Sequence, residues 1–417
     1  MRYFPILFLI SLATQLLFAQ NFDPPQIEKL ITTGQYQKAL ALLKSKDKAS
    51  KETHHKIADI YFRLEEYNQA RVYYKKILEE GSDYLAKIRL AHISNKSRKY
   101  DEAIQIYKSL LQEDEENLFI QYNLGKLYLS QRKTKDAIEV FKNLIEKDST
   151  IANYHYQLGL AFGLNNKPFS ALDTYLTAFA IDSTNINTIY KLALTFNEVK
   201  IRDSTSVFTE KGLAIEPDHM NLNRLKINRL RREKKFNEAI KILEKQDRIY
   251  PKEVYNQEML GICYFNLDSL KRASTFFKKA LRLNPENYKF FTYLGEIELG
   301  LENYTHAVSN FQIAAASGKT KLDQEYYGSG MAYLKMGENK KALSFFKKAY
   351  EDNKKNHQAL FELAKTSDGY YADKKIAYKH YQNYLKHFGD QSDQTKFIEK
   401  RMRTIKENYF QKGIPLE

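Results

Sequence analysis

Residues 122–128 read Tyr-Asn-Leu-Gly-Lys-Leu-Tyr, and the pattern returns further along the chain as Tyr-Gln-Leu-Gly-Leu-Ala-Phe at 156–162. The same interval separates the Leu-Gly pair at 260–261 from the Leu-Gly pair at 294–295. A fixed period of roughly 20 to 50 residues is typical of repeat proteins, whose short units cannot bury their apolar faces alone and therefore stack. The stretch predicts one continuous array of stacked units.

A small residue recurs in the second half of each predicted unit and sets the period. The intervals between successive small residues are 31, then 33, then 34 six times, then 35 twice. After all but Thr205, a large apolar or aromatic residue stands four positions later, which places the two on one face of a helix. The small residues are Ala39, Ala70, Ala103, Ala137, Ala171, Thr205, Ala239, Ala273, Ala307, Ala342 and Ala377.

Each unit is predicted to be a pair of helices. The first helix carries a Leu-Gly or Leu-Ala pair, although Gly in a helix interior costs about 1 kcal/mol relative to Ala. Because the glycine recurs, we expect the aromatic residue of the second helix to fill the space of the absent side chain. Pro217, Pro251 and Pro285 follow one another at the period of the repeat and are expected to end second helices.

These residues resemble the tetratricopeptide repeat family. The similarity is carried by residues 122–125 with Tyr128, Ala137 and Phe141, which follow the family's first-helix and second-helix pattern. It covers about residues 26–388. The resemblance implies an all-α fold, namely an α-solenoid (a right-handed superhelix) of ten to eleven helix pairs with a C-terminal capping helix.

The resemblance is weakest at 186–219, where Thr205, Thr209 and Gly212 replace the usual alanine and aromatic residues. We therefore expect a soft spot, or a change in curvature, in the second helix of that unit. The organisation expected for the whole chain is a signal peptide at 1–19, an atypical N-terminal helix pair at 20–50, the repeat array at 51–388, and a capping helix and tail at 389–417.

The first residues have the composition of an export signal. Arg2 is followed by a mostly apolar run at 6–18 that is interrupted by polar residues, and Ala19 offers a small residue before a cut. We expect an exported protein that is periplasmic or associated with the outer membrane. The leader is not followed by a cysteine, so we expect no lipid anchor, and retention of the leader as an anchor stays open.

The bulk composition fits amphipathic helices. The chain has 417 residues, 43% of them hydrophobic and 28% charged, with a net charge of +15. The positive charge has two readings, a soluble lysine-rich outer surface or an anionic partner. The single cysteine, Cys263, excludes an intramolecular disulfide and is expected to be a small core residue.

No group of residues indicates catalysis. The adjacent His54 and His55 should point to different faces of a helix, which argues against a metal pair. The chain has no glycine-rich phosphate loop and no Gly-x-Ser-x-Gly motif. We therefore expect no enzymatic activity, no cofactor, no metal and no small-molecule substrate.

The tetratricopeptide resemblance implies that the first helices line a concave groove for a peptide or a partner helix. Tyr122, Tyr156 and Tyr190 recur at the period of the repeat and are expected to form an aromatic ladder there. The alternative is that tyrosine is simply the usual family residue at this position. The groove residues expected on this pattern are Tyr122, Lys126, Tyr156, Tyr190, Arg224, Asn228 and Tyr327.

The basic stretch at 224–235 is the second candidate surface. Arg224, Asn228 and Arg232 are four residues apart and are expected to share a helix face. Arg224, Arg231 and Arg232 are the residues of the expected anion patch, and a solvated helix face is the alternative. The preferred function is a non-catalytic protein-binding scaffold of the cell envelope that does not bind nucleic acid, and peripheral membrane association stays open. The alternative is a binder of an anionic envelope polymer or lipid headgroup through residues 224–235.

Overall fold

The computed structural model describes residues 24–45, 50–316, 320–389 and 394–416. Within these ranges the chain forms 23 α-helices and no strand, which confirms the predicted all-α class. None of the helices in the described ranges is both long and apolar enough to span a bilayer. The predicted signal peptide at 1–19 lies outside the described residues.

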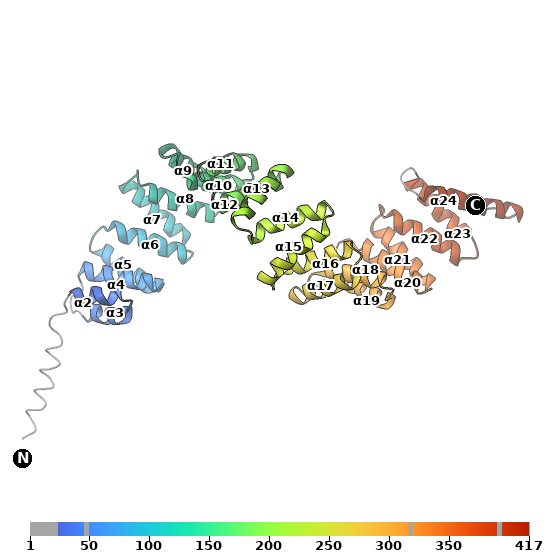
Figure 1. The fold of residues 1–417 in the computed structure, drawn as a ribbon, viewed down its shortest axis with the longest axis horizontal. Coiled ribbons are helices and arrows are strands. Elements are labelled where there is room, and N and C mark those ends of the chain that lie inside the picture. Colours follow the sequence, from blue (N-terminus) through green and yellow to red (C-terminus); the bar gives the residue numbers. More distant parts are fainter. Residues whose placement is uncertain (1–23, 46–49, 317–319, 390–393, 417) are drawn as a thin grey trace, which may run out of the picture. The chain divides into compact units, whose positions relative to one another are not determined.

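The chain divides into two compact units, Met1–Ile215 (unit 1) and Glu216–Glu417 (unit 2), which Figure 1 shows in blue to green and in green to red. The helices of unit 1 are α2 (Pro24–Thr32), α3 (Tyr36–Lys44), α4 (Lys51–Arg63), α5 (Tyr67–Glu79), α6 (Tyr84–Lys96), α7 (Tyr100–Glu113), α8 (Leu118–Ser130), α9 (Thr134–Lys147), α10 (Ala152–Leu164), α11 (Pro168–Ile181), α12 (Ile186–Glu198) and α13 (Arg202–Ile215). The helices of unit 2 are α14 (Met220–Arg232), α15 (Phe236–Ile249), α16 (Val254–Asn266), α17 (Leu270–Leu283), α18 (Tyr288–Gly300), α19 (Tyr304–Ala315), α20 (Asp323–Lys335), α21 (Asn339–Asp352), α22 (His357–Tyr370), α23 (Lys375–Phe388) and α24 (Thr395–Gln411).

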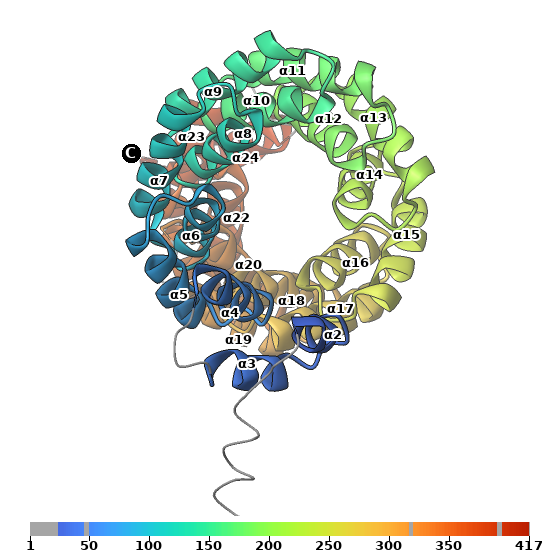
Figure 2. The same cartoon turned by 90° about the vertical axis from the view of Figure 1, so that its left-hand side faces the viewer.

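Within each unit, every helix packs against the next one along the chain, so the elements form stacked pairs. The first helices of the pairs lie on one side of the stack and the second helices on the other. In Figure 2, α8, α10 and α12 of unit 1 lie inside α9, α11 and α13, and α16 and α18 of unit 2 lie inside α17 and α19. We call the surface formed by the first helices of a unit its inner face. This arrangement confirms the predicted α-solenoid.

Glycines on the first helices allow the aromatic residues of the second helices to approach. A Cβ atom at Gly125 of α8 would lie 2.7 Å from Cζ of Phe141 on α9, and one at Gly295 would lie 2.7 Å from Cδ1 of Phe311. Phe141 is fully buried. The prediction that each ring fills the space of a missing side chain is therefore confirmed.

The turn inside each pair uses a left-handed residue. Arg132 has φ of 54°, and its N–H donates to the Leu129 carbonyl, while the N–H of Lys133 donates to the Tyr128 carbonyl at 2.9 Å. These two bonds form a Schellman motif, which satisfies the last carbonyls of a helix. The residues with positive φ at equivalent turns are Gly34, Glu65, Arg98, Arg132, Asn166, Lys200, Lys234, Asp268, Glu302 and Gly337.

The ends of the second helices agree with the proline prediction. Helices α13, α15 and α17 end at Ile215, Ile249 and Leu283, in each case two residues before a proline. Proline cannot donate the backbone hydrogen bond that would continue the helix. The following first helix often begins with a side-chain cap, as where the Asn117 side chain accepts from the N–H of Ile120 at 3.1 Å.

The atypical unit formed by α12 and α13 packs through a different ring. Thr205 and Thr209 are buried, and their hydroxyls donate to carbonyls four residues earlier, at 2.8 and 2.7 Å. Phe208 stacks on Phe196 with ring centroids 5.6 Å apart and meets Phe179 edge-on at 5.3 Å. Phe208 thus supplies the aromatic contact one position before the usual one. The softness expected of this helix stays a prediction.

Helix α24 packs on the last pair through Ile398 and Ile405, which are both buried. Phe397 of the same helix is 47% exposed, and its ring lies edge-on to Phe361 at a centroid distance of 5.9 Å. Arg401 extends from α24 to the buried Asp368 of α22 and donates two hydrogen bonds to its carboxylate.

Candidate functional site

Tyr122 lies half-buried on the inner face of unit 1. Its ring meets Phe141 edge-on, with centroids 6.2 Å apart and an interplanar angle of 71°. Asn153 Nδ2 on α10 donates to its hydroxyl at 2.6 Å, and the ammonium of the exposed Lys126 lies 5.4 Å from the ring centroid. The ring is therefore anchored from behind and capped by a cation–π contact.

Tyr156 and Tyr190 occupy the equivalent places on α10 and α12, and both are half-buried. The ring of Tyr156 lies 5.9 Å from that of Tyr175. Burial raises the pKa of the Tyr156 phenol, and the charge of Tyr122 adds to this shift.

A further tyrosine, which the sequence pattern did not single out, joins this surface. The ring of Tyr154 lies 5.9 Å from that of Tyr122 at an angle of 39°. Asn153 and Gln157 also direct amide groups to the Tyr122 hydroxyl, at 2.6 and 3.4 Å. Tyr154 and Gln157 do not recur at the period of the repeat, whereas Asn153 does recur, as Asn187 and Asn221, a signal that the sequence analysis did not use.

Arg224 and Asn228 share one partner on the inner face of unit 2. The Arg224 guanidinium lies 4.8 Å from the ring centroid of Tyr255, and its Nη2 pairs with Glu253 at 2.7 Å. The Tyr255 hydroxyl donates to Asn228 Oδ1 at 3.2 Å. Burial raises the pKa of Tyr255 to about 12, against the opposing charges of Arg231 and Arg224.

The three arginines of the expected anion patch, Arg224, Arg231 and Arg232, have different surroundings, and their role in anion binding stays a prediction. Arg231, seven residues after Arg224, faces α16, and its Nη1 contacts the sulfur of Met259 at 2.9 Å. Arg232 is exposed. Arg231 therefore takes the place that the four-residue spacing assigned to Arg232.

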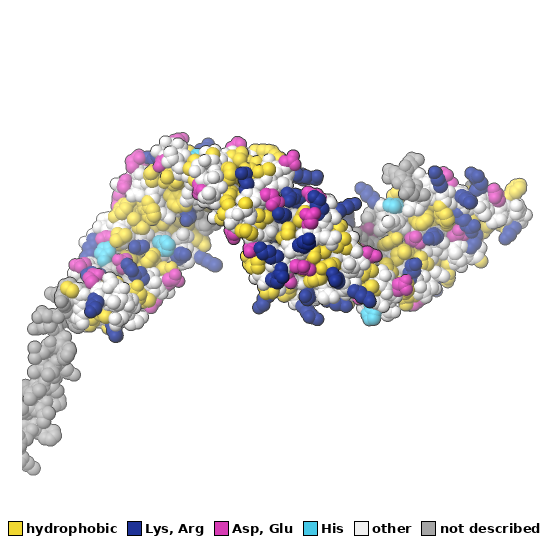
Figure 3. Space-filling view, in the orientation of Figure 1, with side chains coloured by type: hydrophobic (Ala, Val, Ile, Leu, Met, Phe, Trp, Pro, Cys, Tyr) yellow, Lys and Arg dark blue, Asp and Glu magenta, His cyan; other side chains and the backbone are white. Residues whose placement is uncertain are grey.

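Acidic side chains lie among the cations of the basic stretch. Glu233 pairs with Lys235 at 2.9 Å and lies 3.9 Å from Arg229. On the face of unit 2 shown in Figure 3, Lys and Arg side chains are interspersed with Asp and Glu. The stretch is therefore not a uniform patch of positive charge.

Tyr327 on α20 repeats the arrangement of Tyr156. Its ring lies 5.9 Å from that of Phe346 on α21, and burial raises the pKa of its phenol. A Cβ atom at Gly330 would lie 2.6 Å from Phe346 Cδ1, so this ring also occupies the space of a missing side chain. The inner faces of both units thus carry half-buried tyrosines backed by aromatic residues of the second helices.

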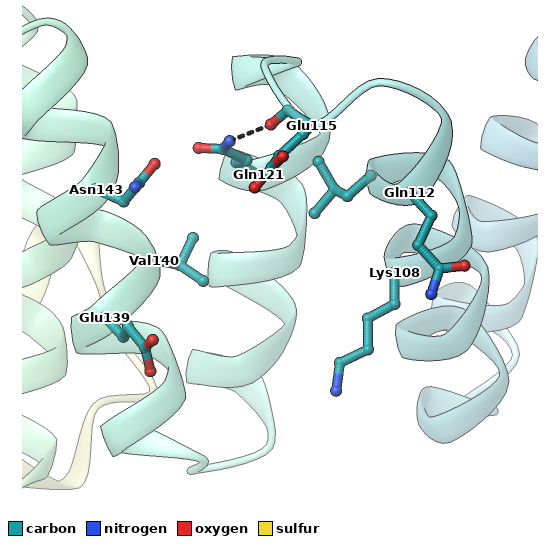
Figure 4. Close-up of a pocket in the computed structure, with 8 residues that line it drawn as sticks. Lys108, Gln112, Glu115, Gln121, Glu139, Val140 and Asn143 are labelled. Atoms are coloured by element: carbon teal, nitrogen blue, oxygen red, sulfur yellow. Dashed lines mark hydrogen bonds between the residues drawn. The ribbon is translucent and has the colours of Figure 1, made fainter.

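A pocket of about 670 Å³ lies between the second helices α7 and α9. Figure 4 shows Lys108 and Gln112 of α7 opposite Glu139, Val140 and Asn143 of α9. Between these two helices, the Gln121 amide of α8 donates to the Glu115 carbonyl at 2.7 Å. The lining is a mixture of Lys, Glu, Gln, Asn and aliphatic side chains, without a nucleophile next to a base.

The histidines and the cysteine are accounted for by local contacts. His54 Nδ1 lies 3.0 Å from Glu80, whereas His55 Nε2 lies 2.9 Å from Asp83, so the two rings use different partners. Cys263 is fully buried, and burial raises the pKa of its thiol to about 11. Across the described ranges, no group of three His, Cys, Asp or Glu residues is placed to hold a metal ion.

Sequence comparison finds tetratricopeptide repeats in four segments. One tetratricopeptide repeat model matches residues 95–157, and a second matches residues 52–80, 257–287 and 326–356. A comparison with curated proteins gave no match. Proteins of this repeat family generally act through protein–protein interaction rather than catalysis.

Solved structures with similar folds share little sequence with the chain. MamA from Desulfovibrio magneticus RS-1 is 23% identical over 41% of this chain and 96% of its own, with a TM-score of 0.38. Yeast Tom70 is 13% identical over 92% of this chain and 95% of its own, with a TM-score of 0.39. YrrB, described as a protein with an unusual peptide-binding site, is 20% identical over 46% of this chain and 97% of its own, with a TM-score of 0.38. The segments at 52–80, 95–157, 257–287 and 326–356 are thus similar to tetratricopeptide repeats, in agreement with the α-solenoid of helix pairs.

Proposed function

We propose that the protein is a non-catalytic scaffold of the cell envelope, and that it binds a peptide or helix of a partner protein along its inner faces. The observation that carries this proposal is the row of half-buried tyrosines on successive first helices, Tyr122, Tyr156 and Tyr190 in unit 1 and Tyr327 in unit 2. Tyrosines held in this way offer contact area and a polar tip while losing little rotamer freedom on binding.

The anchoring of each ring supports recognition. Tyr122 is held by Phe141 behind it and by Asn153 at its hydroxyl, and Lys126 beside it is exposed. A side chain that is already ordered loses less entropy when a partner binds, so more of the contact energy appears as affinity. Central anchored aromatic residues are the type that dominates protein interfaces.

The binding proposal is tested by capturing partners from cells after crosslinking, followed by mass spectrometry. Tyr122→Ala and Lys126→Glu should reduce the yield of the partner at least several-fold. Phe169→Ala and Lys142→Glu, at exposed positions of the second helices α11 and α9, are the matched controls and should leave the yield unchanged. Equal loss in both sets, with all variants folded by circular dichroism, would refute inner-face binding.

The envelope location is proposed from the leader at 1–19. It is tested by cell fractionation and by N-terminal sequencing of the protein recovered from the envelope. The expected result is a periplasmic or outer-membrane-associated chain that begins at Gln20. A chain recovered from the cytoplasm with an intact leader would remove the envelope from the proposal but would leave protein binding to be judged on the crosslinking result.

A further inference from the structure

The inner face of unit 2 carries opposite charges at two places. Arg231 of α14 and Glu296 of α18 are both half-buried on first helices. The ion pairs formed by the described residues of these helices join Arg224 to Glu253, Arg229 to Glu233 and Glu298 to Lys278. Neither Arg231 nor Glu296 has an ionic partner within the described ranges.

The guanidinium of Arg231 is held against apolar and aromatic side chains. Its Nη1 contacts the Met259 sulfur at 2.9 Å, and its Nε is buried with no hydrogen-bond partner among the described residues. A guanidinium carries five N–H donors, and a thioether is a weak acceptor. A buried donor without a good acceptor is costly, so a carboxylate placed here would gain strong charge-assisted hydrogen bonds.

Tyr293 on α18 is influenced by both charges. Its ring stacks on Phe277 with centroids 4.5 Å apart and an angle of 10°. Burial raises the pKa of its phenol, the charge of Glu296 adds to the shift, and the charge of Arg231 opposes it. Both charges therefore act on the same phenol of the inner face.

Glu296 lies beside a second carboxylate. Glu325 of α20 is fully buried, and its Oε1 accepts a hydrogen bond from the Thr292 hydroxyl at 2.7 Å. Burial, followed by the charge of Glu325, raises the pKa of Glu296. The neighbouring carboxylate thus disfavours ionisation of Glu296, and a cation placed beside Glu296 would relieve this repulsion.

We propose that the inner face of unit 2 binds a peptide segment of mixed charge, in which a carboxylate contacts Arg231 and a Lys or Arg of the same segment contacts Glu296. The inference rests on the proposed function and deepens it by naming the chemistry of the partner. Complementary charge at two fixed places sets the register of a bound chain and rejects segments of a single charge sign.

The test uses the full chain and a fluorescein-labelled peptide of twelve residues, with two glutamates and two lysines separated by four neutral residues. Binding is measured by fluorescence anisotropy. Two further peptides replace either both glutamates or both lysines by glutamine. Arg231→Gln should lower the affinity for the mixed peptide about tenfold and leave the affinity for the peptide without glutamates unchanged. Glu296→Gln should lower the affinity for the mixed peptide about tenfold and leave the affinity for the peptide without lysines unchanged.

The neighbouring variants Arg232→Gln and Glu286→Gln change exposed residues of the same charge and should alter the affinity less than twofold. Absence of binding by the mixed peptide, or equal loss for all three peptides, would overturn the inference. Binding to phosphatidylglycerol vesicles is measured in parallel. If the protein binds these vesicles, and Arg232→Gln abolishes this binding while Arg231→Gln does not, the basic stretch is a lipid-binding surface and the inference is overturned.

The outcome is separable from that of the proposed function. If crosslinked partner is still lost in Tyr122→Ala while the mixed peptide does not bind, inner-face recognition stands and only the charge pattern fails. If the mixed peptide binds as expected but no partner depends on Tyr122, the charge pattern of unit 2 stands and the proposed row of tyrosines fails.

Discussion

Tyr175 of α11 occupies the space that a side chain at Gly159 of α10 would need. A Cβ atom at Gly159 would lie 2.5 Å from Tyr175 Cδ1 and 2.9 Å from Thr174 Oγ1. On the same helix, a Cβ atom at Gly163 would have only the Tyr175 hydroxyl nearby, at 4.0 Å. Two glycines four residues apart therefore have opposite roles, one in packing and one without a packing requirement.

Gly159→Ala should lower the free energy of unfolding by about 1–3 kcal/mol, because forcing an extra methyl into a packed core outweighs the better helix propensity of alanine. Gly163→Ala is the matched control and should raise stability by up to about 1 kcal/mol. Urea unfolding followed by circular dichroism measures both. Similar effects of the two substitutions would contradict the packing role of Tyr175.

The left-handed turn residues predict a stabilising change. Glu302 has φ of 63° and Gly337, at the equivalent turn of the next pair, has φ of 77°. Glu302→Gly should raise the free energy of unfolding by about 0.5–1 kcal/mol, because a side chain is strained in this conformation, and Gly337→Ala should lower it by about 1 kcal/mol. Thermal melting measures both variants. A lower melting temperature for Glu302→Gly together with a higher one for Gly337→Ala would contradict this expectation.

The contact between Arg401 and Asp368 should hold α24 on the last pair. Arg401 Nε and Nη2 donate to the two Asp368 oxygens at 2.6 and 3.0 Å, and the Asp368 side chain is 9% exposed. Arg401→Gln should cost about 1–3 kcal/mol, less than for a fully buried pair because the Arg401 side chain is 35% exposed. Limited proteolysis should show faster cleavage within 395–411, whereas the exposed control Arg403→Gln should behave like the parent.

The environment of Glu296 predicts a pH-dependent stability. Its pKa is raised from 4.5 by burial and then by Glu325, so the folded state retains the proton to a higher pH than the unfolded chain. The stabilisation is fully present below about pH 4.5 and is lost as the pH rises through the raised pKa. Glu296→Gln should therefore be more stable than the parent at pH 7, and this difference should disappear near pH 4.

Melting curves from pH 4 to pH 8 test this expectation, with the exposed Glu286→Gln as the control. The control should show no comparable trend. A Glu296→Gln protein that is less stable than the parent at pH 7 would show that the carboxylate makes a favourable contact in the folded state.

Much of the fold could be predicted because the residues that pack against one another within a repeat recur at fixed positions in the sequence. The recurring Leu-Gly pair identified the first helix of a repeat. The aromatic residue four positions after Ala137 or Ala171 identified the second helix. Both patterns repeat at the same period, which indicated that the glycine and the aromatic ring face each other. The prolines at 217, 251 and 285 predicted three helix ends, because proline cannot donate the backbone hydrogen bond that would continue a helix.

The turn conformations could not be predicted in the same way. Lys200, Lys234 and Glu302 adopt positive φ although none of them favours it. Their conformation is imposed by the two Schellman hydrogen bonds and by the packing of the helices on either side, which are tertiary effects. At equivalent turns, Gly34, Asn166 and Gly337 are of residue types that adopt positive φ readily.

The sequence predicted where the candidate site lies but not which residues contact one another within it. The period of the repeat indicated the row of tyrosines, but Tyr154, which contacts Tyr122 from the next first helix, follows no such spacing. Asn153, the hydrogen-bond partner of Tyr122, does recur at 187 and 221, but its type alone did not indicate a contact with the tyrosine. For the basic stretch, a four-residue spacing pointed to Arg232, whereas the contact with α16 is made by Arg231. On a helix, positions seven apart share a face as well as positions four apart, so spacing alone did not decide between the two arginines.

Inner-face recognition is tested most directly by site-specific photocrosslinking in living cells. A photoreactive amino acid is placed at Lys126 of the first helix α8 or at Lys142 of the second helix α9, two exposed lysines on neighbouring helices. We predict a discrete adduct with a partner protein from position 126 and none from position 142. Adducts of equal yield from both positions, or from position 142 alone, would contradict recognition by the inner face.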